Sequence, residues 1–126
     1  MLDQNKVIAV IDDELQMLTA IDHLLTARGF TTQVFSSAEA FLAACTKDAA
    51  CLVLDINLGG MSGIELRRRL ASAGAQLPVI FITAVDDEAT HEEAMAAGCV
   101  ACLHKPFPAD QLLGAIAKAT RAPGPS

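Results

Sequence analysis

The sequence has little positive charge and contains no apolar run long enough to cross a membrane. Nine lysines and arginines stand against fifteen aspartates and glutamates, which gives a net charge of −6. An acidic chain repels the phosphates of nucleic acids and of anionic lipids. The mean hydropathy is +0.40, yet no apolar stretch approaches the roughly 20 residues that span a bilayer. We therefore expect no direct nucleic-acid or membrane binding by these residues.

The first residues, Met1 to Lys6, lack the basic region and the apolar stretch of a secretory signal. We therefore expect a cytoplasmic location. The chain has four cysteines, and in a reducing compartment these are expected to be free thiols rather than a disulfide framework.

The patterning is that of one globular α/β domain. Of 126 residues, 52% are hydrophobic and 19% are charged, which excludes a disordered chain and suits a single core. Short apolar runs predict buried parallel strands, with a more polar strand at 31–35 that suits a sheet edge; the predicted strands are 7–11, 31–35, 51–54, 79–82 and 100–104. Helical patterns lie between and after them, at 15–25, after a capping-box pair Ser36 and Glu39, and at 64–70, 87–97 and 110–120. Strands and helices in alternation predict a doubly wound parallel sheet with right-handed crossovers over residues 1–120. The Pro- and Gly-containing residues 121–126 are expected to form a tail or the start of a linker.

Polar side chains follow four of the five predicted strands. They are Asp12 and Asp13, Asp55, Thr83, and Lys105. In open α/β sheets the carboxyl ends of the strands line the ligand site, so we expect these groups in one pocket. Three close carboxylates need a compensating cation, and Mg²⁺ with oxygen ligands meets that need. A metal, an ammonium and a hydroxyl around a nucleophilic carboxylate are suited to phosphoryl transfer.

With these motifs in this order, residues 5–120 resemble the response-regulator receiver (CheY-like) domain. The matching motifs are Asp12-Asp13, Asp55, Met61 with Gly63, Thr83-Ala84, and Lys105-Pro106-Phe107. The resemblance implies a flavodoxin-like sheet with strand order 2-1-3-4-5. Gly98-Cys99 and Lys105-Pro-Phe are most similar to the receivers of FixJ and NarL-type transcriptional regulators.

The resemblance also implies a role for each matching residue. Asp55 would be the phosphoacceptor in a domain that assists its own phosphorylation and dephosphorylation without being an enzyme. Thr83 and Lys105 would contact the phosphoryl group, and the Lys105–Pro106 peptide would be cis. Mg²⁺ would be held by Asp12 (through water), Asp13, Asp55 and the backbone carbonyl of Asn57. The implied partners are a sensor histidine kinase or a phosphotransfer protein and, on phosphorylation, a second copy of the chain. The implied output is transcription, controlled from the face of the fourth helix, fifth strand and fifth helix through a domain outside these 126 residues.

Other interpretations explain less of the pattern. Asp12 and Asp13 alone could cap a helix, and an unphosphorylated pseudo-receiver could share the fold. A haloacid-dehalogenase-like phosphatase needs an aspartate at position 57, which here is asparagine.

The sequence departs from the family pattern at Cys102, where an aromatic switch residue is usual, and at Gly59, where proline is frequent. The aromatic relay of the signal is therefore in doubt, and the loop at Gly59 is expected to be more flexible. Cys99 and Cys102 form a CxxC, the spacing of redox pairs and of half a zinc site. We interpret them as packing cysteines, because side chains three apart in a strand point to opposite faces and no second ligand pair lies nearby.

Overall fold

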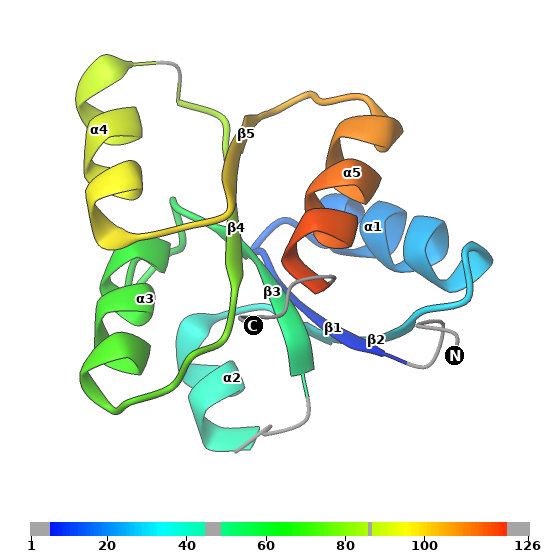
Figure 1. Ribbon diagram of the computed structural model, residues 1–126, viewed down its shortest axis with the longest axis horizontal. Coiled ribbons are helices and arrows are strands. Elements are labelled where there is room, and N and C mark those ends of the chain that lie inside the picture. The colour runs from blue at the N-terminus through cyan, green and yellow to red at the C-terminus, as the bar shows by residue number, and fades with distance from the viewer. Residues whose placement is uncertain (1–5, 45–48, 86, 121–126) are drawn as a thin grey trace.

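The computed structural model describes residues 6–44, 49–85 and 87–120; the expected tail at 121–126 and Cys45 lie outside them. Five parallel strands form one sheet in the order β2-β1-β3-β4-β5, as predicted (Figure 1). The strands are β1 (Val7–Ile11), β2 (Thr31–Phe35), β3 (Ala49–Asp55), β4 (Val79–Thr83) and β5 (Ala101–His104). The helices are α1 (Leu15–Ala27), α2 (Ala38–Ala44), α3 (Gly63–Ser72), α4 (Glu88–Ala97) and α5 (Ala109–Thr120).

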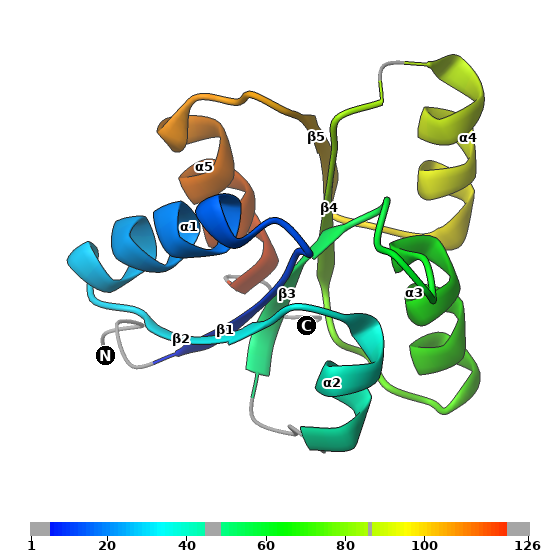
Figure 2. The same cartoon turned by 180° about the vertical axis from the view of Figure 1, so that it is seen from behind.

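Helices cover both faces of the sheet. Helices α1 and α5 lie on one face, and α2, α3 and α4 on the other (Figures 1 and 2). Successive strand residues point to opposite faces, so β4 sends Ile80 and Ile82 into the cluster with α1 and α5. Its Val79 and Phe81 join the cluster with α2, α3 and α4. This double burial explains why the central strands are apolar throughout.

Helix α1 is held to the sheet by Leu18, Ile21 and Leu25, which recur at the spacing of one helix face and are all buried. Strand β2 pairs with β1 and lies at the edge of the sheet, as its polarity predicts. Within the described residues, no helix is both long and apolar enough to cross a membrane.

At the carboxyl edge, strands β3 and β4 extend one residue further than the apolar runs predict. Asp55 pairs with Ile82 and Thr83 pairs with His104 in the sheet ladder. Backbone pairing therefore continues through the polar residues, so Asp55 and Thr83 belong to the strands and share their rigidity.

Two local expectations are wrong. The cap of α2 is Ser37, whose Oγ accepts from the Ala40 N–H at 3.0 Å, and Ser36 and Glu39 form no capping box. Strand β5 begins at Ala101, one residue later than predicted, and Cys99 lies before it. The expectation that Cys99 and Cys102 point to opposite faces is wrong, because both pack against the cluster with α2, α3 and α4.

Substitution of Leu112 by alanine should strongly destabilise the domain. This α5 side chain is 0% exposed in the core against the sheet, and the cavity left by a buried Leu→Ala change costs about 2–5 kcal/mol. Leu15→Ala is the matched control, because Leu15 is 74% exposed. Urea unfolding should show a lower free energy of unfolding for Leu112→Ala and no comparable decrease for Leu15→Ala. Equal decreases in both variants would contradict the packing described.

Candidate functional site

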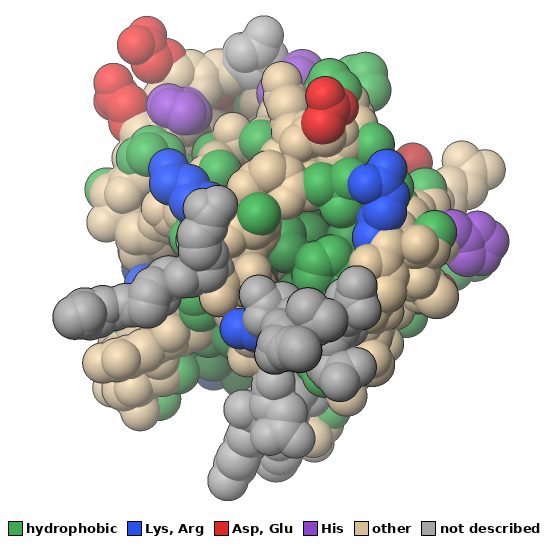
Figure 3. Space-filling view, turned by 45° about the vertical axis from the view of Figure 1, so that its right-hand side comes forward, with side chains coloured by type: hydrophobic (Ala, Val, Ile, Leu, Met, Phe, Trp, Pro, Cys, Tyr) green, Lys and Arg blue, Asp and Glu red, His purple; other side chains and the backbone are tan. Residues whose placement is uncertain are grey.

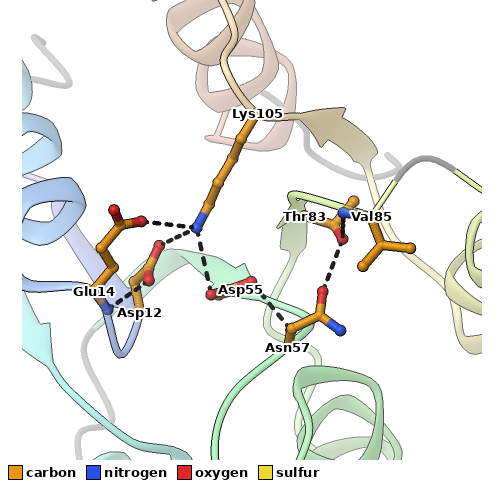
Figure 4. A network of polar contacts seen from close by, with 7 residues as sticks. All are labelled: Asp12, Glu14, Asp55, Asn57, Thr83, Val85 and Lys105. Atoms are coloured by element: carbon orange, nitrogen blue, oxygen red, sulfur yellow. Dashed lines mark hydrogen bonds and ion pairs between the residues drawn. The ribbon is translucent and has the colours of Figure 1, made fainter.

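The polar residues predicted from the strand ends do lie together at the carboxyl edge of the sheet (Figure 4). Asp12 follows β1, Asp55 ends β3 and Thr83 ends β4, while Lys105 follows β5. Figure 3 shows that, on the face in view, acidic side chains gather toward the top, which is the end of the molecule that the carboxyl ends of β4 and β5 approach in Figure 1.

Three aspartates form the acidic centre of this site. Asp12, Asp13 and Asp55 each offer a carboxylate oxygen, and these oxygens lie within 4.8 Å of one another. Asp12 is 0% and Asp55 is 3% exposed, whereas Asp13 is open to solvent. Asp12 is not the N-cap of α1, because that position is occupied by Glu14. Asp12 Oδ1 accepts a hydrogen bond from the Glu14 N–H at 2.9 Å.

Lys105 partly neutralises the aspartates. Its Nζ lies 3.0 Å from Asp12 Oδ2, 3.4 Å from Asp55 Oδ2 and 3.7 Å from Glu14 Oε1. Burial acts to lower the pKa of Lys105, but the contact with Asp12 and the charges of Asp55 and Asp12 outweigh it, so the pKa is raised. The ammonium is therefore a permanent positive charge at this edge. The Lys105–Pro106 peptide is cis, as predicted.

Asp55 is held in an environment that opposes its ionisation. Burial is the largest influence and, with the charge of Asp12, raises its pKa to about 6. The Asn57 N–H, which donates to Asp55 Oδ1 at 3.1 Å, and the charge of Lys105 act in the opposite direction. One lysine therefore does not offset the cost of burying this carboxylate among like charges.

The donor set fits a hard divalent cation. Asp12 Oδ2 is buried, and the ammonium of Lys105, 3.0 Å away, is shared with Asp55. One positive charge does not balance three carboxylates, and a divalent cation among them would offset the remaining charge. Several carboxylate oxygens with one open side match what Mg²⁺ takes in proteins.

Thr83 and Asn57 are linked by a contact that the sequence did not reveal. The Thr83 hydroxyl donates to Asn57 Oδ1 at 3.0 Å and accepts from the Val85 N–H at 3.0 Å. The hydroxyl therefore points toward the loop after β3 (Figure 4). The sequence did show a polar side chain, Asn57, two residues after Asp55. It did not show that Thr83 is its hydrogen-bond partner.

Gly63 brings α3 against the backbone of Asp55. A Cβ at this position would lie 2.3 Å from the Asp55 carbonyl oxygen, and the Gly63 N–H donates to the Ile56 carbonyl at 3.0 Å. Only glycine allows this approach, which fixes both ends of the loop that follows Asp55.

Cys102 borders a hollow next to Thr83. The hollow has a volume of about 280 Å³, and its lining also includes Val85, His91 and His104. His104 is exposed, as expected. The small thiol at the usual aromatic position thus leaves open space beside the strand-end hydroxyl.

Comparison with known proteins identifies the class that this fold and site define. The model of the response regulator receiver domain matches residues 8–117, and the chain belongs to this family. It is therefore a receiver domain of two-component systems, a family of phosphoacceptors that bind Mg²⁺ at an acidic pocket and interact with histidine kinases.

The most similar relatives found include transcriptional regulators. The chain is 39% identical over 122 residues to the response regulator protein TmoT of Ectopseudomonas mendocina, covering 96% of this chain and 56% of TmoT. It is 36% identical to the transcriptional regulatory protein FixJ of Bradyrhizobium diazoefficiens, covering 94% of this chain and 58% of FixJ. The chain thus spans little more than half the length of these relatives.

Solved structures agree in fold. A crystal structure of FixJ-N superposes with a TM-score of 0.87 at 34% identity, and the match covers 100% of both chains. The response regulator StyR has a TM-score of 0.85 at 35% identity, with 93% of this chain and 60% of StyR covered.

Replacing Asp55 by asparagine should stabilise the metal-free fold at neutral pH. The folded pKa of about 6 lies above the ordinary value of 3.8, so the group's stability contribution is complete below about pH 4 and is lost as the pH rises through about 6. At pH 7.5 the free energy of unfolding of Asp55→Asn should therefore exceed that of the wild-type protein by about 1–3 kcal/mol. The difference should be smaller at pH 5.5.

Urea unfolding in EDTA measures this gain. The control is Asp110→Asn, which removes an exposed carboxylate and should gain nothing comparable. Adding Mg²⁺ should stabilise the wild-type protein more than Asp55→Asn. An Asp55→Asn variant less stable than wild type at pH 7.5 in EDTA would contradict the electrostatics described.

Proposed function

We propose that this domain takes a phosphoryl group on Asp55 from a sensor histidine kinase or a phosphotransfer protein in the cytoplasm. The observation that supports this most is the position of Asp55, which is buried at the sheet edge with the Lys105 ammonium in contact with both Asp55 and Asp12. Mg²⁺ would be held by Asp12, through water, and by Asp13, Asp55 and the backbone carbonyl of Asn57. When bound, the ion would supply charge neutralisation for the reacting groups.

The transfer needs an ionised Asp55. A carboxylate oxygen of Asp55 attacks phosphorus, an O–P bond forms, and the P–N bond of the phosphohistidine breaks with its electron pair going to the imidazole. Lys105, whose Nζ lies 3.4 Å from Asp55 Oδ2, is placed to pair with an oxygen of the incoming group. The same residues would then assist hydrolysis of the acyl phosphate.

Thr83 would change its hydrogen bonding when Asp55 is phosphorylated. Its hydroxyl donates to Asn57 Oδ1, so it must release that contact to donate to a phosphoryl oxygen on Asp55. The hollow beside Cys102 borders Thr83 and lies between α4 and β5. We propose that the face of α4, β5 and α5 carries the response, by forming a homodimer and controlling transcription through a further domain. The lengths and names of the relatives support that output.

Intact-mass spectrometry after incubation with acetyl phosphate tests the assignment. Wild-type protein should gain one phosphoryl group with Mg²⁺ and almost none in EDTA, because the ionised carboxylate cluster needs the cation. Asp55→Asn should gain none, and Asp110→Asn should behave as wild type because that carboxylate is exposed on α5. Thr83→Ala should react more slowly.

Two results would overturn the proposal. Phosphorylation that persists in Asp55→Asn would place the acceptor elsewhere. A folded wild-type protein that takes no phosphoryl group would leave the unphosphorylated interaction module as the function.

A further inference from the structure

Glu39 of α2 contacts the loop between β3 and α3. The Met61 N–H donates to Glu39 Oε2 at 3.1 Å, across 22 residues of sequence. At the preceding residue, Gly60, φ is +103°, and a Cβ there would lie 3.0 Å from the same oxygen. The carboxylate therefore lies directly against the backbone of the Gly59-Gly60 turn.

Glu39 is free for this contact because α2 is capped without it. The Ser37 hydroxyl accepts from the Ala40 N–H, which leaves the Glu39 carboxylate available. Helix α2 is itself anchored by buried Ala38 and Phe41, and the Phe41 ring meets the Phe35 ring edge-on with centroids 5.4 Å apart. The carboxylate thus projects from a fixed support.

The rest of the loop belongs to the site. Gly63 fixes its end against Asp55 and Ile56, and Asn57 fixes its beginning by donating to Asp55 Oδ1. A Cβ at Gly59 would lie 3.9 Å from Asp13 Oδ2. Two successive glycines between these points have wide conformational freedom, and the bond to Glu39 restricts it.

We propose that Glu39 is a positioning residue of the acidic site: by holding the Met61 N–H, it fixes the loop that carries Asn57 next to the three aspartates. This inference rests on the proposed function, because the loop matters for Mg²⁺ and phosphoryl binding. It explains how a loop with glycines at both 59 and 60 keeps one conformation. The expected flexibility of that loop is reduced by a contact from α2.

The test compares Glu39→Ala, Glu39→Gln and Glu92→Ala. Glu92 is an exposed residue of α4, so Glu92→Ala removes the same charge without touching the loop. Glu39→Gln removes the charge but keeps a side-chain oxygen that can accept from Met61. Thermal unfolding checks that all three variants are folded.

Three measurements are made on each variant. Amide hydrogen exchange of Met61, followed by NMR without metal, reports the contact itself. Titration with Mg²⁺, followed by the amide shift of Asn57, reports the site without any phosphorylation, and acetyl phosphate then gives the Mg²⁺ needed for half-maximal phosphorylation.

In Glu39→Ala, Met61 should exchange about 2- to 10-fold faster and the Mg²⁺ requirement should rise about 2- to 10-fold, the range expected for one hydrogen bond. The rate at saturating Mg²⁺ should stay near wild type. Glu39→Gln and Glu92→Ala should both remain within about twofold of wild type, since neither loses the contact.

Equal effects in Glu39→Ala and Glu39→Gln would show a charge effect and overturn the positioning role. An unchanged Mg²⁺ requirement in Glu39→Ala would overturn it too, while leaving phosphorylation on Asp55 intact. A wild-type protein that binds no Mg²⁺ and takes no phosphoryl group would instead overturn the proposed function, and the role of Glu39 with it.

Discussion

Repulsion among carboxylates at one edge of the sheet is the constraint on which the rest of the site depends. Asp12, Asp13 and Asp55 present oxygens within 4.8 Å of one another, and Lys105 is the neighbouring cation that partly offsets them. The result is a pKa of about 6 for Asp55, so without a metal and below that pH this group is mostly protonated and a poor nucleophile. A divalent cation would lower that pKa and offset the remaining negative charge of the three carboxylates. Ionisation of the aspartate and metal binding are thus linked.

The fold maintains this unfavourable cluster because its carboxylates belong to rigid elements. Asp55 still pairs with Ile82 in the ladder, and the strands below are buried on both faces. Gly63 presses α3 against the Asp55 carbonyl, and Glu39 reaches the same loop from α2. The apolar core therefore stabilises a concentration of charge that a flexible loop would disperse.

Much of this was predictable, because periodicity and composition act locally. Apolar runs predict the buried strands. The polar residues at or just after their ends, such as Asp55 and Lys105, predict the site because parallel strands align their carboxyl ends. What failed depends on exact boundaries or on the direction of one side chain. Cys99 and Cys102 pack against the same cluster rather than on opposite faces. Glu39 has the spacing of a capping box but turns to Met61, and the Thr83–Asn57 contact joins residues 26 apart. Such contacts depend on how α2 and the loops sit on the sheet, which no local pattern contains.

The carboxyl carbon of Asp55, followed by ¹³C NMR as the pH is varied, reports the charge balance directly. Without metal, the titration should have its midpoint at about pH 6. With saturating Mg²⁺ the midpoint should fall well below that value, because the cation favours the ionised carboxylate. A metal-free midpoint near the ordinary value of 3.8, or one that Mg²⁺ leaves unchanged, would contradict the link between metal binding and the reactivity of Asp55.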